Sequence, residues 1–212
     1  ESSEAVPITE PLTMLEFSKA PEFTSATLNR EVDQGEFFDL ASALDGNTTF
    51  VLLFTSSMCA GCLEHTSLLS TVSREWEQRD NPIQIISIQR YPAYETEEQV
   101  EDTYGDEKSE FYAPWPVLIT NTNATTLNGV SSNFSSVNSA FGNPGTPTMF
   151  IIDSNGDLRA KSVIYYLDGQ LDRLEEQISD IQATTCQFLE SWIQSISLLD
   201  TAFRTNYGIP VR

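Results

Sequence analysis

The chain has 212 residues, of which 40% are hydrophobic, so it is long enough to bury one sizeable core in a single domain with additions. It carries 31 acidic and 11 basic residues, a formal net charge of −20, and a surface of that sign repels phosphate backbones, which excludes nucleic acid as a partner. The sequence contains no apolar run of about 18 residues or more and therefore predicts no membrane span. An acidic chain with few lysines also fits a protein that works in high salt.

The two ends of the chain differ in composition from its middle. Residues 1–16 mix Glu, Ser, Pro and Thr without periodicity, and we expect them to form a leader or linker. They have neither the basic start nor the apolar centre of a signal peptide, so we expect that any export signal or tether has been removed or left out. The folded domain is expected at 17–184 and a helical extension at 185–212.

A buried strand is expected early in the domain. The sequence predicts a short helix near 38–44, a turn at Asp45-Gly46 and a strand at 50–55. The strand contains the unbroken apolar run FVLLF, which is typical of a strand covered on both faces, as in a parallel sheet under helices.

The hydrophobic period then changes from that of a strand to that of a helix. Cys62, Leu69, Val72 and Trp76 are spaced by seven, three and four residues, so they form one stripe of an amphipathic helix. A β-branched run at 83–89 predicts the next strand. Strand, helix and strand in this order predict a right-handed βαβ unit.

The second half predicts a shorter series of elements. We expect a short acidic helix at 95–105, a strand at 115–120 and a polar surface insertion at about 121–139. Two strand-like runs joined by Ser154-Asn155-Gly156 predict a hairpin, because Asn-Gly tolerates the positive φ that such turns need. Helical spacing follows at Leu171, Leu174 and Ile178, and a further amphipathic segment begins at Cys186.

Two motifs carry a resemblance to a known family. The first is Cys59-Ala60-Gly61-Cys62, directly after the buried strand, and the second is Gly145-Thr146-Pro147-Thr148, directly before the hairpin. Together with Ala20-Pro21-Glu22-Phe23 and the run GTPTMFIIDSNG (145–156), they resemble the thioredoxin superfamily, and within it the TlpA-like and ResA-like extracytoplasmic thiol-disulfide oxidoreductases. The likeness runs from about Ala20 to about Ile181.

The resemblance implies a thioredoxin-like α/β fold, with a central mixed β-sheet flanked by helices and, here, an extra C-terminal helix. It implies a redox-active disulfide between Cys59 and Cys62, beside a cis-proline at Pro147. It also implies an enzyme that needs no bound cofactor and no metal, and that acts outside the cytoplasm, in the periplasm or at the cell surface, free or tethered through a segment absent from the sequence. Its partners would be protein thiol or disulfide substrates and a thiol electron donor, with reduction of disulfides as the expected direction.

The position of the first cysteine suits this chemistry. Exchange needs a thiolate, and a cysteine at a helix N-terminus lies beside unpaired N–H groups that favour the anion. We therefore expect Cys59 to attack the partner and Cys62, one turn into the helix, to resolve the mixed disulfide. We expect the partner to bind against Met58, Ala60, Gly61, Thr146 and Pro147, because small residues allow close approach and the proline loop offers its backbone to an extended peptide.

Several residues depart from the family pattern. Met58 stands where the family usually has an aromatic residue, and Leu53 stands where it often has a buried acidic or polar side chain. His65 is the only histidine, and we expect it to be solvated on the helix surface, although an imidazolium there could stabilise a thiolate. Glu64 is expected to be a surface acid.

Two other kinds of site are compatible with the cysteines. Cys59, Cys62, His65 and Cys186 form a Cys₃His set that could hold zinc, although CxxC zinc sites usually arise on turns rather than at a strand-to-helix junction. The second alternative is a redox-inactive thioredoxin-like binding module in which Cys59 and Cys62 form a structural disulfide. Cys186 alone is expected to be a small buried hydrophobe or to form an intermolecular disulfide.

Overall fold

The computed structural model describes residues 10–120, 125–126, 137–162 and 169–185. In this part of the chain one mixed sheet has the strand order β1-β9-β8-β4-β5-β6-β2-β3, and β7 pairs with β2. The strands are β1 (Leu12–Lys19), β2 (Phe23–Thr27), β3 (Phe37–Asp39), β4 (Thr49–Thr55), β5 (Ile83–Gln89), β6 (Val117–Ile119), β7 (Thr125–Thr126), β8 (Thr148–Ile152) and β9 (Asp157–Ser162).

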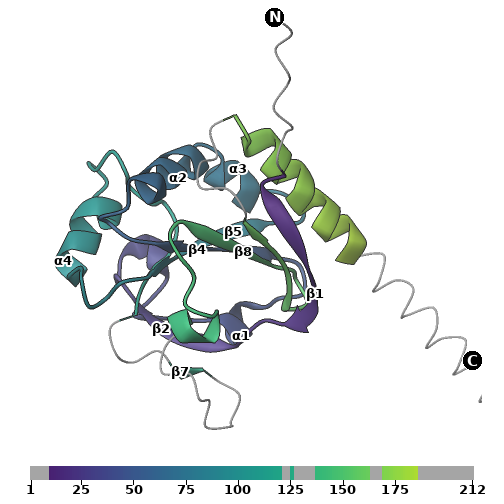
Figure 1. Cartoon of the computed structure of the whole chain (residues 1–212), viewed down its shortest axis with the longest axis horizontal. Helices are drawn as coiled ribbons and strands as arrows, with labels where there is room; N and C mark the ends of the chain where they lie inside the picture. The colour runs from purple at the N-terminus through teal and green to yellow at the C-terminus, as the bar shows by residue number, and fades with distance from the viewer. Residues whose placement is uncertain (1–9, 121–124, 127–136, 163–168, 186–212) are drawn as a thin grey trace, which may run out of the picture.

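Helices cover both faces of the sheet (Figure 1). On one face lie α2 (Ala60–Ser70), α3 (Ser73–Glu77) and an unlabelled C-terminal helix described from 171 to 185. On the other face lie α1 (Leu40–Ala43) and α5 (Val137–Ala140). The remaining helical segments are α4 (Glu97–Val100), a 3₁₀ turn at Glu31–Asp33 and a π-helical turn, η2, at Glu101–Gly105. The expected α/β fold with a mixed sheet between helices, and with a C-terminal helix, is confirmed.

Strand β4 is the centre of this arrangement. It pairs in parallel with β5 and antiparallel with β8, and all seven of its residues are buried. Val51 and Leu53 point to the helical face with α2, whereas Phe50, Leu52 and Phe54 point to the opposite face. This alternation explains the unbroken apolar run in the sequence, because both faces of the strand are covered.

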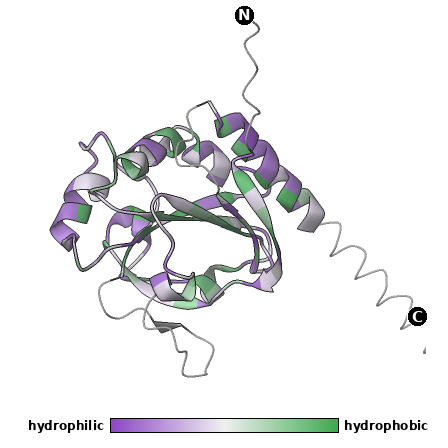
Figure 2. Cartoon of the chain, in the orientation of Figure 1, coloured by the Kyte–Doolittle hydropathy of each residue, from purple (hydrophilic) through white to green (hydrophobic). Residues whose placement is uncertain are grey.

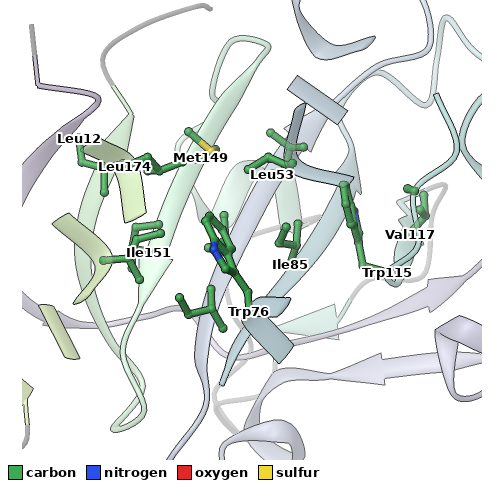
Figure 3. Packing of buried hydrophobic residues seen from close by; sticks show 14 of the residues in the cluster. Leu12, Leu53, Trp76, Ile85, Trp115, Val117, Met149, Ile151 and Leu174 are labelled. Atoms are coloured by element: carbon green, nitrogen blue, oxygen red, sulfur yellow. The ribbon is translucent and has the colours of Figure 1, made fainter. Parts of the chain in front are cut away.

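Two apolar clusters, one on each side of the sheet, make up the core. The helix-side core contains Trp76 and Trp115, which pack with Leu53, Ile85 and residues of the C-terminal helix (Figure 3). The phenylalanine core lies on the other side and contains Phe23, Phe38, Phe50, Phe54, Phe141 and Phe150. Apolar residues follow the central strands, while the C-terminal helix alternates between hydrophilic and hydrophobic residues along its length, as expected for a helix with one buried side (Figure 2).

The first strand begins earlier than composition indicates. Residues 12–16, which we expected in the leader, lie in β1 and pair with β9, with Leu12 opposite Ser162 and Met14 opposite Ala160. Leu12 is buried, and its backbone N–H donates to Gln177 Oε1 at 3.0 Å. An edge strand with one partner needs only alternate apolar residues, so its composition resembles that of a linker. Residues 1–9 and 186–212 lie outside the described part.

Three predicted helices are each divided into two elements in the structure. The helix expected through Trp76 is α2 followed by α3, because the N–H groups of Thr71 and Val72 bond three residues back, to the carbonyls of Leu68 and Leu69, and tighten the last turn. The short helix expected at 38–44 is the strand β3 followed by α1, and the acidic helix expected at 95–105 is α4 followed by η2.

The other predicted elements agree with the structure where it describes them. The strands at 83–89 and 115–120 are β5 and β6, and the hairpin is β8 and β9 with Gly156 at φ 79° in the turn. Of the predicted insertion at 121–139, only β7 and the residues from Val137 onward belong to the described ranges. The amphipathic segment that begins at Cys186 lies beyond them.

Arg30 joins the chain before the 3₁₀ turn to the segment between η2 and β6. Its guanidinium binds both carboxylate oxygens of Asp33, at 3.0 and 3.1 Å. It also donates to the carbonyls of Tyr104 (2.9 Å), Trp115 (2.9 Å) and Ala113 (3.3 Å). Since the side chain of Asp33 is fully buried and that of Arg30 is 12% exposed, this is an interior ion pair with nearly all of its donors in use.

We expect Arg30→Met to lower the free energy of unfolding by about 3–5 kcal/mol, because it leaves the buried Asp33 carboxylate without its cation. The free energy of unfolding of Arg30→Lys should lie between those of the wild type and Arg30→Met, since lysine keeps the charge but cannot reproduce the planar fork of the guanidinium. The control is Lys19→Met, which removes the Lys19–Asp157 pair from a side chain that is 71% exposed and should cost about 1 kcal/mol or less. Urea unfolding with the disulfide intact measures the free energy of unfolding of all three variants. Equal losses of this free energy in Arg30→Met and Lys19→Met would contradict the assignment of Arg30 and Asp33 as an interior ion pair.

Candidate functional site

The chain leaves β4 at Thr55, turns through Ser56, Ser57 and Met58, and enters α2 at Ala60. Cys59 is the residue before the helix, with extended dihedral angles (φ −105°, ψ 106°). Its N–H donates to Ser56 O at 3.1 Å, and its carbonyl accepts the first helical bonds, from the N–H groups of Cys62 and Leu63. The sulfur of Cys59 also accepts from the N–H of Cys62 at 3.2 Å. The first cysteine thus has the N-terminal helical position that the sequence predicts.

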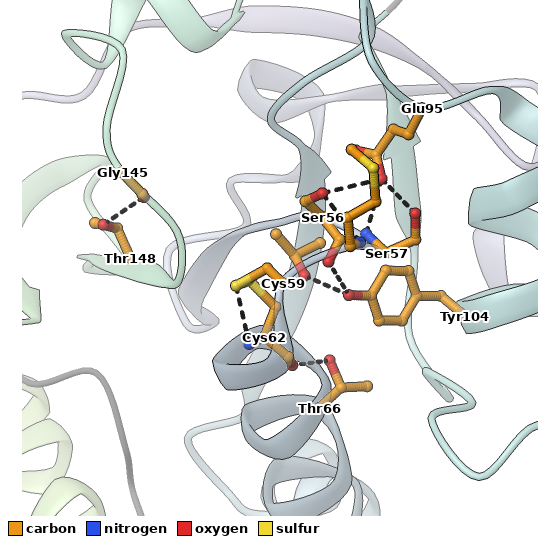
Figure 4. Close-up of a disulfide and its surroundings, with 11 residues drawn as sticks. Ser56, Ser57, Cys59, Cys62, Thr66, Glu95, Tyr104, Gly145 and Thr148 are labelled. Carbon is orange, nitrogen blue, oxygen red and sulfur yellow. Dashed lines mark hydrogen bonds between the residues drawn. A yellow bond between two sulfur atoms is a disulfide. The ribbon is translucent and has the colours of Figure 1, made fainter.

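Cys59 and Cys62 form a disulfide with a Cα–Cα distance of 5.2 Å (Figure 4). Cys62 is fully buried and Cys59 is half-buried, so Cys59 is the more exposed of the two residues. Gly61 is buried in the first turn, whereas Ala60 is exposed. Met58, immediately before Cys59, is 58% exposed.

The loop with Thr146 and Pro147 reaches the same end of the sheet. Phe54 of β4 pairs with Thr148 of β8, so the loop that precedes Thr148 begins level with the end of β4. The Thr146–Pro147 peptide bond is cis, and Thr148 Oγ1 donates to Gly145 O at 2.7 Å. Figure 4 shows this loop across from the disulfide. Thr146 is half-buried, Pro147 is buried, and the structure brings the residues of both motifs to one edge of the sheet.

The segment after β5 joins these two motifs. The N–H of Arg90 donates to Thr55 O at 2.8 Å, and its Nε donates to Pro144 O at 2.5 Å. The same guanidinium lies over the ring of Tyr91, 4.8 Å from its centroid. Arg90 therefore links the end of β4 to the loop that carries Pro147, a role that no local sequence pattern indicates.

Glu95, in the same segment, binds the turn before Cys59. Its Oε2 accepts from Ser57 N at 2.7 Å, from Ser57 Oγ at 2.6 Å and from Ser56 Oγ at 3.2 Å (Figure 4). The sequence predicts this residue as the first of a short acidic helix at 95–105. A signal against that assignment exists, because Thr96 and Gln99 form a capping box and α4 begins only after Glu95.

Tyr104 also supports this turn. Its hydroxyl donates to Ser56 O at 2.8 Å and lies 2.9 Å from Thr55 Oγ1. Burial raises the pKa of Tyr104 well above its usual value; the bond to Thr55 opposes this rise, and the negative charge of Glu95 adds to it. The hydroxyl therefore stays a proton donor to the Ser56 carbonyl throughout the physiological pH range.

The prediction of a solvated His65 is wrong. His65 is fully buried on α2, together with Cys62, Thr66 and Leu69. Its position three residues after Cys62 and four before Leu69 places it on the inward side of the helix, so the spacing itself contained the signal. Glu64 is exposed, as expected, and Leu53 lies in the helix-side core.

The described part of the chain contains no group of three or more His, Cys, Asp or Glu side chains arranged to hold a metal ion. Cys186, the third cysteine of the zinc alternative, lies outside it. Within the same residues, no helix is both long enough and apolar enough to cross a membrane.

Comparison with known proteins adds to the structural argument. No family model matches the sequence, and no curated protein matches it. Among solved structures, a thiol:disulfide interchange protein of the thioredoxin family from Chlorobium tepidum is 20% identical with a TM-score of 0.52, over 77% of this chain and 97% of that one.

Two structures from Bacteroides are similar in the same way. A protein from Bacteroides thetaiotaomicron, assigned as a protein disulfide isomerase, is 18% identical with a TM-score of 0.55, over 82% of this chain and 93% of that one. The thioredoxin domain of a thiol-disulfide oxidoreductase from Bacteroides vulgatus is 16% identical with a TM-score of 0.51, over 79% of this chain and 98% of that one. At these identities the likeness concerns the fold, and the chain has the thioredoxin-like fold.

Proposed function

We propose that the chain is a thiol-disulfide oxidoreductase that exchanges electrons with protein substrates through Cys59 and Cys62. The observation that supports this most strongly is the disulfide at the start of α2, with one sulfur accessible and the loop of Pro147 across from it. The similarity in fold to thiol-disulfide oxidoreductases supports the same reaction.

Reduction of a substrate begins from the dithiol form of the pair. The Cys59 thiolate attacks one sulfur of the substrate disulfide, and the other substrate sulfur leaves as a thiolate that takes up a proton. Cys62 then loses its proton and attacks the Cys59 sulfur. This step restores the Cys59–Cys62 disulfide and releases the second substrate thiol. Two electrons pass to the substrate, and a thiol donor returns them to the pair.

Backbone N–H groups are in place to stabilise the Cys59 thiolate. The N–H of Cys62 already points to the Cys59 sulfur at 3.2 Å, and it can keep this contact when the disulfide opens. The positive end of α2 adds to the stabilisation. Buried Cys62 lacks access to solvent, which suits a sulfur that attacks only within the protein.

The residues around Cys59 form the proposed contact surface for the partner. Met58 and Ala60 are exposed on either side of Cys59, and Gly61 keeps the first turn of α2 narrow. Across from them, the backbone at Thr146 can pair with an extended peptide, and Pro147 carries no N–H that would compete for it. We place this exchange outside the cytoplasm, with disulfide reduction as its direction, on the family resemblance of the two motifs.

A redox-inactive binding module is the second candidate. The apolar Leu53 within the helix-side core favours it, because this position often carries an acidic or polar side chain in the family that the motifs resemble. A reduction potential well below about −300 mV, together with no turnover, would identify the Cys59–Cys62 bond as structural and support this candidate instead.

We expect Cys59→Ser to reduce turnover of a disulfide-bonded protein, with dithiothreitol as donor, to the uncatalysed rate, because the attacking sulfur is lost. Cys62→Ser should instead accumulate a mixed disulfide at Cys59, visible by mass spectrometry and lost on reduction. The matched control is Cys186→Ser, which removes the third cysteine and should keep wild-type turnover. Full activity of Cys59→Ser would eliminate the mechanism.

We expect Met58→Ala to lower kcat/KM for a protein substrate about two- to tenfold, because an exposed apolar side chain beside Cys59 is lost from the contact with the partner. The reduction potential should stay unchanged, since no charge is altered. Met14→Ala, on β1, is the control because Met14 is similarly exposed, at 52% against 58% for Met58. Equal kcat/KM values for the two variants would show that Met58 takes no part in substrate binding.

A further inference from the structure

Three carboxylates are buried in the part of the chain that the structure describes, and one of them differs from the other two. Asp33 pairs with Arg30 at 3.0 Å, and Asp153 pairs with Arg159 at 2.7 Å. Glu95 is 4% exposed and has no ion-pair partner among the described residues. A buried carboxylate without a cation is costly to keep, so its presence at the turn that precedes Cys59 calls for a reason other than stability.

Hydrogen bonds take the place of a cation at Glu95. Oε2 accepts all three bonds from the turn: those of Ser57 N, Ser57 Oγ and Ser56 Oγ. Oε1 is equally buried and has no hydrogen-bond partner within the described residues. The donors at Oε2 are neutral dipoles, so they stabilise the negative charge without cancelling its field.

The bonds of Glu95 lead directly to Cys59. Ser56 donates its hydroxyl to Glu95, and its carbonyl accepts from the N–H of Cys59 at 3.1 Å and from the hydroxyl of Tyr104 at 2.8 Å. Glu95 therefore fixes the Ser56–Met58 turn, which Cys59 directly follows, and it does so from within the protein (Figure 4).

The other charged and titratable groups near this turn come from three elements. His65 lies buried on α2, and Tyr104 lies on η2 with its proton engaged by Ser56 O. Arg90, after β5, is directed to Pro144 O and to the ring of Tyr91. The start of α2 favours a thiolate at Cys59, and Glu95 is the acid that opposes it from inside the protein.

We propose that Glu95 is a positioning residue that holds the Ser56–Met58 turn and, through its uncompensated charge, disfavours a thiolate at Cys59, which keeps the Cys59–Cys62 couple strongly reducing. This inference deepens the proposed function and rests on it. It assigns control of the reduction potential to a residue of the segment after β5. Strand β4, which precedes the cysteines, has the apolar Leu53 instead of a charged side chain.

The sign of the effect on the reduction potential follows from the number of protons that the Cys59–Cys62 couple takes up on reduction. Reduction of the disulfide takes two electrons and two protons and gives two thiols, and it takes one proton fewer where Cys59 remains a thiolate. Whatever stabilises that thiolate stabilises the reduced form and raises the reduction potential. A negative charge nearby does the opposite, so it makes the reduced pair a stronger donor of electrons.

The test is Glu95→Gln, which keeps an oxygen to accept from Ser57 and removes the charge. Titration of the reduced protein, followed by the ultraviolet absorbance of the thiolate, should give a pKa of Cys59 about one unit lower than in the wild type. Equilibration with glutathione at a pH above the pKa of Cys59 in both proteins should shift by up to about tenfold toward the reduced protein, which is a rise of about 30 mV in potential. The matched control is Glu98→Gln, which removes the same charge from an exposed position on α4 and should change neither quantity by more than about twofold.

Two further variants separate charge from folding. Glu95→Ala removes the acceptor as well as the charge and should also lower the free energy of unfolding, because Ser57 N–H loses its partner. Ser57→Ala removes one hydrogen bond to the Glu95 carboxylate, so the carboxylate is held less firmly at the turn. The pKa of Cys59 should then shift in the same direction as in Glu95→Gln, by a smaller amount. If Glu95→Gln fails to fold, this variant still tests the inference.

The outcomes distinguish this inference from the proposed function. An unchanged pKa of Cys59 and an unchanged potential in folded Glu95→Gln would overturn the role of Glu95, even if the wild type turns over substrate. Absence of turnover in the wild type would overturn the proposed function, whereas the pKa of Cys59 in the reduced protein would still report the effect of the charge. A lower pKa together with a higher potential supports the inference.

Discussion

The pairing of β4 with its two neighbours determines where every part of the site lies. Thr55 is opposite Gln89 of β5, and Phe54 is opposite Thr148 of β8, so one edge of the sheet receives the end of β4, the end of β5 and the start of β8. The turn to Cys59, the segment with Arg90 and Glu95, and the loop of Pro147 all leave from that edge. A shift of the register by one residue would exchange the two buried faces of β4, and the apolar layers on both sides oppose it.

At this edge of the sheet, some groups stabilise a thiolate at Cys59 and others destabilise it. The N–H groups at the start of α2 stabilise negative charge on the Cys59 sulfur, while the charge of Glu95 opposes it. Tyr104 holds the Ser56 carbonyl in place without adding a charge. The site thus uses few ionised groups, although the chain as a whole carries a formal charge of −20.

Local signals were sufficient for the parts of the structure that short stretches of sequence determine. The apolar run of β4, the Asn-Gly hairpin turn and the helix that begins after Cys59 were all predicted, because each depends on neighbouring residues. Residues 12–16 were missed because their strand is defined by pairing with β9, far along the chain. The contacts of Glu95 were missed for the same reason. His65 was placed wrongly although its spacing from Cys62 and Leu69 indicated the buried side of α2.

The two faces of the sheet differ in their aromatic residues, and this difference has a spectroscopic consequence. Trp76 and Trp115 both lie in the helix-side core, whereas the opposite core is built around phenylalanine rings. Indole emission from the described part of the chain therefore originates in the layer that contains α2. Loosening of the phenylalanine layer would leave that emission nearly unchanged, so in a Trp192→Phe variant fluorescence and amide hydrogen exchange can report separately on the two halves of the molecule.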